Sequence, residues 1–514
     1  MSQTRTVNTA RNIVWTYVDF ALTFVFTYLA RSIIIKYLGE EYLGLSSLYS
    51  SILNVLNIAE LGFASAIVYN LYEPIAQNDY EKANAIINFL KKAYLVIGLT
   101  IYICGLALCP FIKFIIKGNT DVGINIYLLF ILYLTNVAAG YLLFAYKVTL
   151  LTALQRLDRT KKIYSLVNIF QYSAQIFSVI VLKNFYLYVV CAITGTVAKN
   201  IVVSYLVNKF YPEFKCTGII SKETRESIKT RIKGLLICKI SAASYTSFDS
   251  VIVTSFLGLT SVAIYGNYML VYYSATNLIA MLRQAMQASI GNKLACDSLE
   301  QNLDNAYLWQ FGFANMACFV SICMLCLFQN FIIVWVGEEM TLPQIDIVLL
   351  SLLLYISTIQ HSFNLYLTGA GMWWNLRYVY SIGAISNLVM NIILCSFLDT
   401  TGVILSTVIS QLLFGYCLHT KILFKDLFKI NVLSYHYRNL RYFAVYVCLG
   451  ALMFFLCNLI QGDGWLTLIL RSAICIVLLP SILLLLYRKN AYLKTLLGYI
   501  FSSLSHFLFI QKPV

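Results

Sequence analysis

The stretch AYLWQFGFANMACFVSICMLCLF, residues 306–328, contains no charged side chain and is long enough to cross a lipid bilayer as one α-helix. A spanning helix needs about 20 predominantly apolar residues, because each residue advances the helix by about 1.5 Å and the hydrocarbon layer is about 30 Å thick. Similar runs precede and follow it along the chain. The stretch therefore indicates a chain that crosses the membrane repeatedly.

The composition of the whole chain supports this interpretation. Of 514 residues, 60% are hydrophobic and only 11% are charged, whereas soluble domains carry about 25% charged residues. The apolar runs are too long and too uniform for barrel strands, and an open sheet would expose backbone groups to lipid. We predict an all-α polytopic membrane protein with about fourteen spans. They are expected at residues 12–36, 43–69, 92–116, 123–150, 163–183, 185–208, 234–257, 260–283, 306–328, 343–369, 379–397, 400–420, 442–461 and 466–487.

The distribution of basic residues predicts the orientation. The net charge is +15, but the basic residues lie in short gaps between apolar runs, which indicates contact with headgroups and not with nucleic acid. With both termini in the cytoplasm, the inner loops hold most of the lysines and arginines. The outer loops then keep only Lys36, Lys113, Lys117 and Lys183. This asymmetry predicts a multi-pass protein with both termini inside.

The longest basic linker, 209–233, suggests how the chain is divided. We expect an N-lobe of six spans at 1–208, this cytoplasmic linker, and a C-lobe of six spans at 234–423. Two additional spans at 424–487 and a cytoplasmic or interfacial tail at 488–514 follow. Within the tail, 492–510 is short and interrupted by polar residues, so we expect it to lie on the membrane and not to cross it.

The two lobes contain similar sequence motifs at corresponding positions. Leu38-Gly39 stands at the outer end of the first span, and Leu257-Gly258 at the outer end of the seventh. A helix rich in Tyr and Ser follows each pair. Because each lobe has an even number of spans, the lobes are predicted to be related by a pseudo-two-fold axis along the membrane normal, as in several transporters.

Charged residues within the spans are the first candidates for function. A charge at the centre of a spanning helix costs about 2.5–3.5 kcal/mol on insertion scales, so a partner or a wet cavity must explain it. We expect Arg31 and Lys199 either to face a polar cavity or to be paired. Asp249 is expected to bridge to Lys199 or Lys239, or to face the cavity. Further candidates for coupling or charge pairing are Asp19, Glu60 and His361, although a lone histidine is more often a packing residue.

Tyrosine, serine and amide side chains are dense in several spans. In the eighth span these include Tyr265, Asn267 and Tyr268. Aromatic rings suit the apolar faces of a sugar, and hydroxyls and amides suit its hydroxyl groups, so these residues are candidate substrate contacts. Hydrogen bonds between helices use the same residue types, and this alternative stays open.

No motif for catalysis or metal binding is evident. The sequence has no Walker loop, HExxH or GxSxG pattern. Cys323 and Cys326 have the spacing of metal ligands, but they lie in an apolar helix and no second pair accompanies them in sequence. We therefore expect ordinary buried cysteines, no cofactor and no metal, and a protein that is not an enzyme.

Two signatures resemble those of a known family. The first is YLGEEYLGLSSLYSSILNVLNIAELGFASAIVYN at 37–70, and the second is FDSVIVTSFLGLTSVAIYGNYMLV at 248–271. Together they resemble bacterial polysaccharide-transport flippases, the O-antigen and capsule branch of the multidrug/oligosaccharidyl-lipid/polysaccharide exporter superfamily. Many relatives carry Asp where this chain has Glu60, which leaves the proton affinity of that site in doubt.

The resemblance implies two six-helix lobes around a cavity that is often cationic. It also implies flipping of an undecaprenyl-pyrophosphate-linked oligosaccharide across the bacterial inner membrane by alternating access, with a glycan polymerase and a chain-length regulator as protein partners. Arg31 and Lys199 would attract the pyrophosphate. The alternatives are a multidrug exporter of the same superfamily, which the basic excess disfavours, and a membrane glycan polymerase or ligase, which the short outer loops disfavour.

Overall fold

The computed structural model describes residues 2–57, 63–116, 123–154, 156–223, 225–226, 228, 247–462 and 464–498. Every regular element within these residues is helical, which confirms the predicted all-α class. The chain divides into two compact units, unit 1 at Met1–Gly266 and unit 2 at Asn267–Val514. The division falls inside a long helix and not in the basic linker, so the predicted domain limits stay a prediction.

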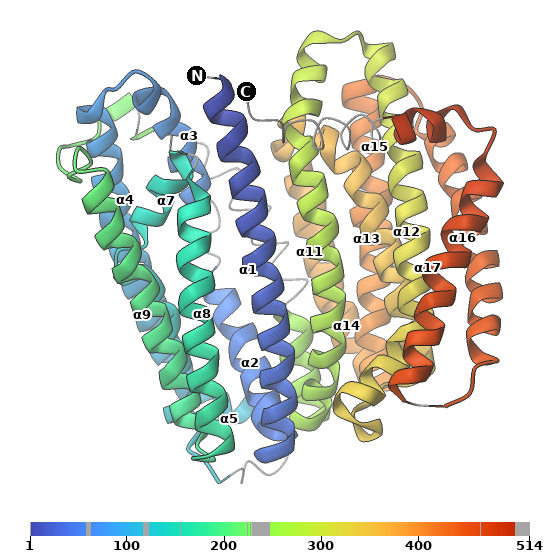
Figure 1. Ribbon diagram of the computed structural model, residues 1–514, viewed down its shortest axis with the longest axis horizontal. Helices are drawn as coiled ribbons and strands as arrows, with labels where there is room; N and C mark the ends of the chain where they lie inside the picture. The colour runs from blue at the N-terminus through green and yellow to red at the C-terminus, as the bar shows by residue number, and fades with distance from the viewer. Residues whose placement is uncertain are drawn as a thin grey trace, which may run out of the picture. The chain divides into compact units, whose positions relative to one another are not determined.

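Unit 1 is built around a row of three long helices. α1 packs against α8, and α8 packs against α9, as Figure 1 shows for the blue and green part of the chain. α4 and α6 pack against each other and α6 packs against α9, which encloses the interior of the unit. The helices of unit 1 are α1 (Ser2–Tyr37), α2 (Glu40–Leu56), α3 (Phe63–Ala76), α4 (Tyr80–Leu108), α5 (Ile112–Ile115), α6 (Ile126–Leu142), α7 (Tyr146–Ala153), α8 (Leu157–Ile180) and α9 (Phe185–Phe210).

Unit 2 is built around α12, which packs against α13, α16 and α17. Its helix α11 (Leu259–Cys296) begins in unit 1 and continues across the boundary between the units. The remaining helices of unit 2 are α12 (Leu299–Val336), α13 (Gln344–Gly369), α14 (Trp373–Ser410), α15 (His419–Leu423), α16 (Leu433–Asn458) and α17 (Trp465–Tyr487), with π-helical turns at Gln411–Leu418 and Phe424–Phe428.

Among the described residues, nine helical segments are long and apolar enough to cross a membrane, and ten if α6 and α7 are one bent span. One of them, Asn375–Phe428, has 54 residues and contains two predicted spans, because Asp399 leaves the helical conformation at φ 51° and ψ −134°. Of the predicted span at 234–257, the structure describes the short apolar helix Ser247–Leu257, and residues 58–62 of the span at 43–69 lie outside the described residues. The predicted span at 260–283 lies within α11. Residues 499–514 of the predicted tail lie outside the described part of the chain.

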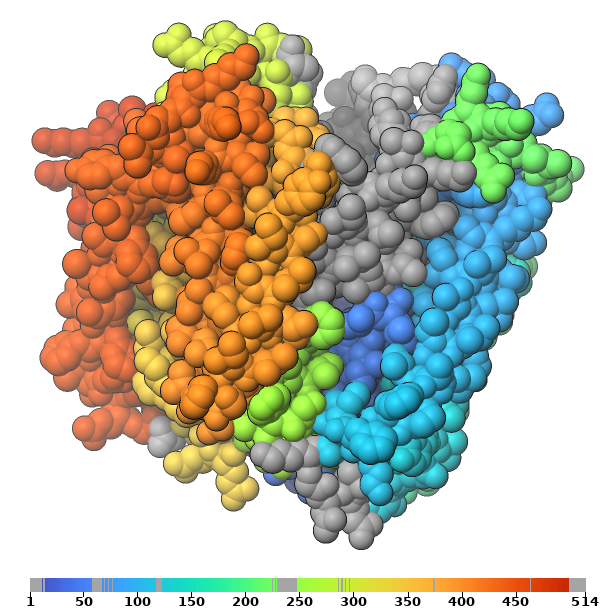
Figure 2. Space-filling view, turned by 180° about the vertical axis from the view of Figure 1, so that it is seen from behind, coloured from blue at the N-terminus to red at the C-terminus, as the bar shows by residue number. Residues whose placement is uncertain are grey.

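Apolar side chains cover the outward faces of the helices. On α4, which belongs to the blue part of Figure 2, Val96 and Ile103 are exposed, and on α14, in orange, Ile385 and Phe397 are exposed. Phe397 retains 79% of its accessible surface. Such faces suit a surrounding of lipid chains, in which an exposed apolar side chain carries no cost.

The glycines of the two Leu-Gly pairs, Leu38-Gly39 and Leu257-Gly258, have similar backbone conformations. Gly39, directly before α2, has φ 111°, and Gly258, directly before α11, has φ 91°. Positive φ values are readily adopted only by glycine, since it has no Cβ. The correspondence that the sequence suggested between the two lobes is therefore also a correspondence of turn geometry.

Candidate functional site

Several ionisable residues of unit 1 lie on the three helices that pack side by side. α1 carries Asp19 and Arg31, which are separated by about 18 Å along the helix axis at 1.5 Å per residue. α8 carries Lys161, and α9 carries Lys199. The interior of unit 1 thus holds charges at several depths, and the contacts of each decide what it can do.

Asp19 forms a salt bridge within the unit. Its Oδ2 atom accepts a hydrogen bond from Lys161 Nζ at 2.8 Å, and its Oδ1 atom accepts one from Asn168 Nδ2 at 3.4 Å. Only 8% of Asp19 is exposed. A buried carboxylate needs such partners, because desolvation of an unpaired charge costs several kcal/mol. The charge-pairing role predicted for Asp19 therefore has a structural basis, with Lys161 as its partner.

Lys199 has a neutral partner. Its Nζ atom donates to Gln171 Oε1 at 3.0 Å and lies 5.8 Å from the centroid of the Tyr164 ring. Gly195, one turn earlier on α9, is closely approached by Gln171, so there is no room for a larger side chain there. Asp19 interacts with Lys199 electrostatically without forming a salt bridge. Among the described residues, an amide and an aromatic ring therefore position the ammonium group, and no carboxylate forms a salt bridge with it.

Arg31 lies among tyrosines. Its guanidinium interacts electrostatically with Tyr188, Tyr28 and Tyr133, and the Tyr133 hydroxyl in turn lies 2.5 Å from Ser46 Oγ. A Cβ atom placed on Gly266 would be only 3.1 Å from Arg31 Nη2. The start of α11 is thus packed directly against the guanidinium. Tyrosine rings and hydroxyls can hold this cation while leaving it positively charged.

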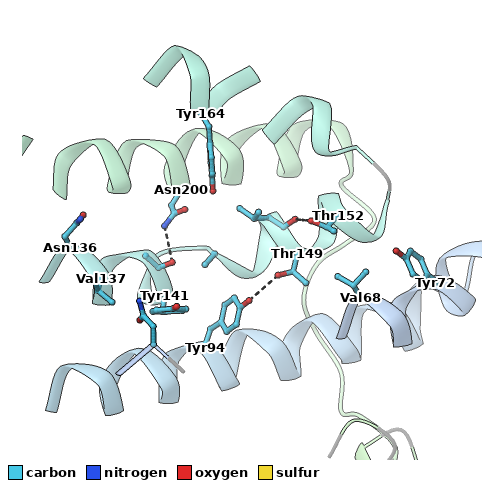
Figure 3. Close-up of a pocket in the computed structure, with 14 residues that line it drawn as sticks. Val68, Tyr72, Tyr94, Asn136, Val137, Tyr141, Thr149, Thr152, Tyr164 and Asn200 are labelled. Atoms are coloured by element: carbon cyan, nitrogen blue, oxygen red, sulfur yellow. Dashed lines mark hydrogen bonds between the residues drawn. The ribbon is translucent and has the colours of Figure 1, made fainter. Parts of the chain in front are cut away.

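A cavity of about 650 Å³ opens inside unit 1 (Figure 3). Tyr164 points into it from α8, and Tyr94 points into it from α4, where its hydroxyl lies 3.4 Å from Thr149 Oγ1. Of the described residues that line the cavity, none is charged. The lining residues are Asn57, Val68, Tyr72, Tyr94, Asn136, Val137, Gly140, Tyr141, Ala145, Val148, Thr149, Thr152, Tyr164 and Asn200.

One residue of the cavity lining also lies next to Lys199. Tyr164 lines the cavity and also stands next to the Lys199 ammonium group. Asn200, which follows Lys199 in sequence, lines the cavity and donates weakly to the carbonyl oxygens of Ala139 and Gly140 at 3.4 and 3.5 Å. A neutral space whose lining includes tyrosine and amide side chains is therefore connected to a positive charge through Tyr164.

The three predicted substrate contacts of the eighth span are buried. Tyr265 is 3% exposed and donates to Asp249 Oδ2 at 3.1 Å. Tyr268 donates to Gln329 Oε1 at 2.7 Å and accepts from the Leu342 N–H at 3.1 Å. Asn267 has no exposed surface. These contacts favour the structural alternative, and a contact with substrate stays a prediction for all three residues.

The remaining predicted residues have varied positions. Glu60 and Lys239 lie outside the described residues. Of the two partners expected for Asp249, Lys239 is thus untested, and Lys199 donates to Gln171 instead. His361, on α13 of unit 2, lies 6.1 Å from the Phe313 ring, centroid to centroid. This contact fits a packing residue, the alternative that the sequence favoured.

Sequence reasoning missed most of the neutral residues of the site. Gln171, Asn136 and Asn200 carry no charge, and a single amide in an apolar helix is too common to single out. Lys161 was assigned to an inner loop, whereas it reaches Asp19 from the first turns of α8. One available signal was the adjacency of Lys199 and Asn200, because two polar residues in succession on a spanning helix indicate more than one polar neighbour.

Comparison with known families is informative only at the level of structure. No family model matches the chain, and no curated protein matches it in sequence. The described fold is instead similar to solved structures of transporters at 12–16% sequence identity. Identity this low establishes the fold and leaves the substrate open.

The similar structures include a flippase and transporters of the MOP superfamily. The lipid II flippase MurJ in an inward closed conformation is 13% identical, with a TM-score of 0.68, and the match covers 93% of this chain and 99% of MurJ. An inward-facing multidrug resistance MATE family transporter of the MOP superfamily is 16% identical, with a TM-score of 0.61, and the match covers 78% and 95% of the two chains. A MOP superfamily transporter from Pyrococcus furiosus, described as having a binding pocket of reversed polarity, is 14% identical with a TM-score of 0.55, and the match covers 82% and 96%.

Taken together, the apolar helices and these similarities show a multi-pass membrane protein with the fold of MOP superfamily transporters. The fold agrees with the superfamily that the sequence signatures indicated, and membership of a particular family stays a prediction. The similar structures are those of transporters and a flippase.

Proposed function

We propose that this chain is a flippase that moves a lipid-linked oligosaccharide, carried on undecaprenyl pyrophosphate, across the bacterial inner membrane. In this proposal both termini lie in the cytoplasm, and the protein alternates between two states that open to opposite sides. A glycan polymerase and a chain-length regulator would act on the translocated product.

The main support for this proposal is the position of Lys199 relative to the cavity of unit 1. Lys199 stands beside a cavity whose described lining is aromatic, amide and hydroxyl in character. A glycan linked to a pyrophosphate needs both parts, since sugars stack on aromatic rings and bond to amides, while phosphate oxygens bind ammonium and guanidinium groups. Arg31, at another depth of the same unit, supplies a second positive charge.

Two variants test the proposal directly. Lys199→Ala and Arg31→Ala, expressed in place of the native protein, should each reduce surface glycan by about tenfold or more, because a charge-assisted hydrogen bond contributes about 1.5–3 kcal/mol. Lys162→Ala is the matched control, since Lys162 is an exposed lysine of α8. Normal export at a normal protein level would remove the substituted residue from the mechanism.

A multidrug exporter is the second candidate, because the fold is also that of a multidrug resistance MATE transporter. A drug cation requires an available carboxylate, whereas the described carboxylate at this site, Asp19, already binds Lys161 at 2.8 Å. Deletion of the gene separates the two candidates. Loss of surface glycan with unchanged drug susceptibility supports the flippase, and the reverse result supports the exporter.

A further inference from the structure

Three buried cysteines meet where three helices of unit 2 pack together. Cys326 lies on α12, Cys457 near the end of α16 and Cys475 on α17. Their sulfur atoms all lie within 4.8 Å of one another, and the Cys457 and Cys475 sulfurs are 3.8 Å apart. Cys323 precedes Cys326 by one helical turn and hydrogen-bonds with Cys475. The second pair that the sequence did not reveal is thus supplied by two other helices.

The spacing of these sulfurs fits metal coordination. A tetrahedral zinc ion has Zn–S bonds of about 2.3 Å, which places its sulfur ligands about 3.8 Å from one another. A disulfide needs a much shorter separation of about 2.05 Å, and all four residues are free cysteines. Simple packing of small apolar side chains gives no reason for three thiols from three helices to converge on one another and not on the surrounding leucines.

A nearby cation balances the charge of such a site. Arg471 stands one helical turn before Cys475 on α17 and interacts electrostatically with Cys457. Its guanidinium is fixed by bonds to Asn330 Oδ1 at 2.7 Å and to the Ile460 carbonyl at 2.8 Å. Three thiolates around Zn²⁺ carry one negative charge, which the guanidinium offsets. Such neutrality matters here, because unbalanced charge is costly in an apolar interior.

We propose that Cys326, Cys457 and Cys475 bind one Zn²⁺ ion and thereby fasten α16 and α17 to α12. These two helices correspond to the two spans that the sequence predicts in addition to the twelve of the lobes. Their packing on α12 involves residues such as Ile322, Met453 and Leu479 around the same cluster. A bound ion would add to this packing an attachment that does not depend on a hydrophobic driving force, which is weak between helices in lipid.

The metal content of the intact protein tests this proposal. Full-length protein, purified without a histidine tag and with its thiols reduced, should contain an equimolar amount of zinc by mass spectrometry. Cys326→Ser and the double variant Cys457→Ser/Cys475→Ser should lose that zinc. The matched control is Cys395→Ser, which replaces a buried cysteine of α14 outside the cluster and should retain it.

A second measurement needs no variant. Replacement of the zinc by Co²⁺ should give the intense visible bands of a tetrahedral thiolate site, and removal of the metal by a chelator should lower the unfolding temperature by several degrees. The proposal is overturned if protein grown and titrated with Zn²⁺ retains no metal, or if Cys326→Ser keeps its zinc. Copper in place of zinc, or a disulfide between Cys457 and Cys475 in the native protein, would overturn it as well.

Discussion

Unit 1 and unit 2 bury polar side chains in different ways. In unit 1, Lys199 is held by one amide and a tyrosine ring, beside a cavity of about 650 Å³. In unit 2, the fully buried Asp346 accepts hydrogen bonds from Thr401 at 2.5 Å and from Thr400 at 3.2 Å, and it has no exposed surface. Lys199 of unit 1 thus lies near open space, whereas Asp346 of unit 2 is bound by neighbouring hydroxyl groups.

This difference distinguishes two roles of buried polar side chains in a membrane protein, helix packing and ligand binding. Buried polar groups that satisfy one another specify how helices pack, and their removal lowers stability. Polar groups beside a cavity can instead bind a ligand, and their removal should alter transport at unchanged stability. Substitutions in unit 1 and unit 2 should therefore have different readouts, which the following predictions test from the largest expected effect to the smallest.

Filling the cavity of unit 1 should have the largest effect. A Cβ atom on Gly140 would meet nothing within 4 Å, so Gly140→Trp should fold and place its ring in the cavity. We expect surface glycan to fall by about tenfold or more, which corresponds to about 1.4 kcal/mol or more. Glycan is measured on cells with equal amounts of folded protein.

Gly140→Ala is the matched control for this variant. The added methyl group leaves the cavity open, and it should stabilise α6 by about 0.5–1 kcal/mol, because glycine is a poor helix former. Export should remain normal. Normal export by Gly140→Trp as well would show that the cavity is not on the path of the substrate.

Removal of the carboxylate in unit 2 should act on stability. Asp346→Ala leaves the hydroxyls of Thr400 and Thr401 without their acceptor, so we expect a loss of about 1–3 kcal/mol in the free energy of unfolding. Thermal unfolding of the purified protein measures this loss, and export should fall only in proportion to the folded protein. Glu339→Ala, an exposed acidic residue of the same unit, should change little. A transport defect in fully stable Asp346→Ala would contradict the assignment of unit 2 to packing.

A methyl group against Arg31 should have a moderate effect. Gly266→Ala would place its Cβ 3.1 Å from Arg31 Nη2 and 2.9 Å from Ser47 Oγ. The flexible guanidinium can move away, so the protein should fold, with a loss of export of about two- to fivefold, or about 0.5–1 kcal/mol. The same glycan measurement applies. If glycan export by Gly266→Ala equalled export by Gly140→Ala, the position of Arg31 would have no effect on transport.

Loss of one hydroxyl should have the smallest effect. Tyr164→Phe keeps the aromatic ring beside Lys199, so export should change by less than about twofold, because the ring supplies the cation–π interaction. Tyr164→Leu removes that interaction and should reduce export further. If the phenylalanine variant lost as much activity as the leucine variant, the hydroxyl and not the ring would be the important group.

Much of the fold could be predicted because its signals are local. Apolar runs predicted the helical class, and the Leu-Gly pairs predicted corresponding turns, which Gly39 and Gly258 form with positive φ. The sequence also identified interior charges as residues that need partners. Asp19 and Lys199 have such partners in unit 1.

The partners themselves could not be predicted. Lys161 was assigned to a loop, and Gln171 is one of many amides in the spans, so neither was identified as a contact of the buried charges. The cysteine cluster could not be predicted either. Cys323 and Cys326 form a recognisable pair in the sequence, but Cys457 and Cys475 are more than a hundred residues away from them. Such pairs depend on how each helix is rotated about its axis, which hydrophobic composition does not specify when every face is apolar.

The sequence by itself determined the solvent of this protein, its helical class and the residues whose charge requires an explanation, because each of these depends on a residue and its near neighbours. Only the tertiary structure decided which side chains contact those charged groups and where a cavity remains. It also decided that the cysteines of α12, α16 and α17 lie close together. These depend on the packing of distant helices, and the cost of burying an unpaired polar group is what makes that packing specific.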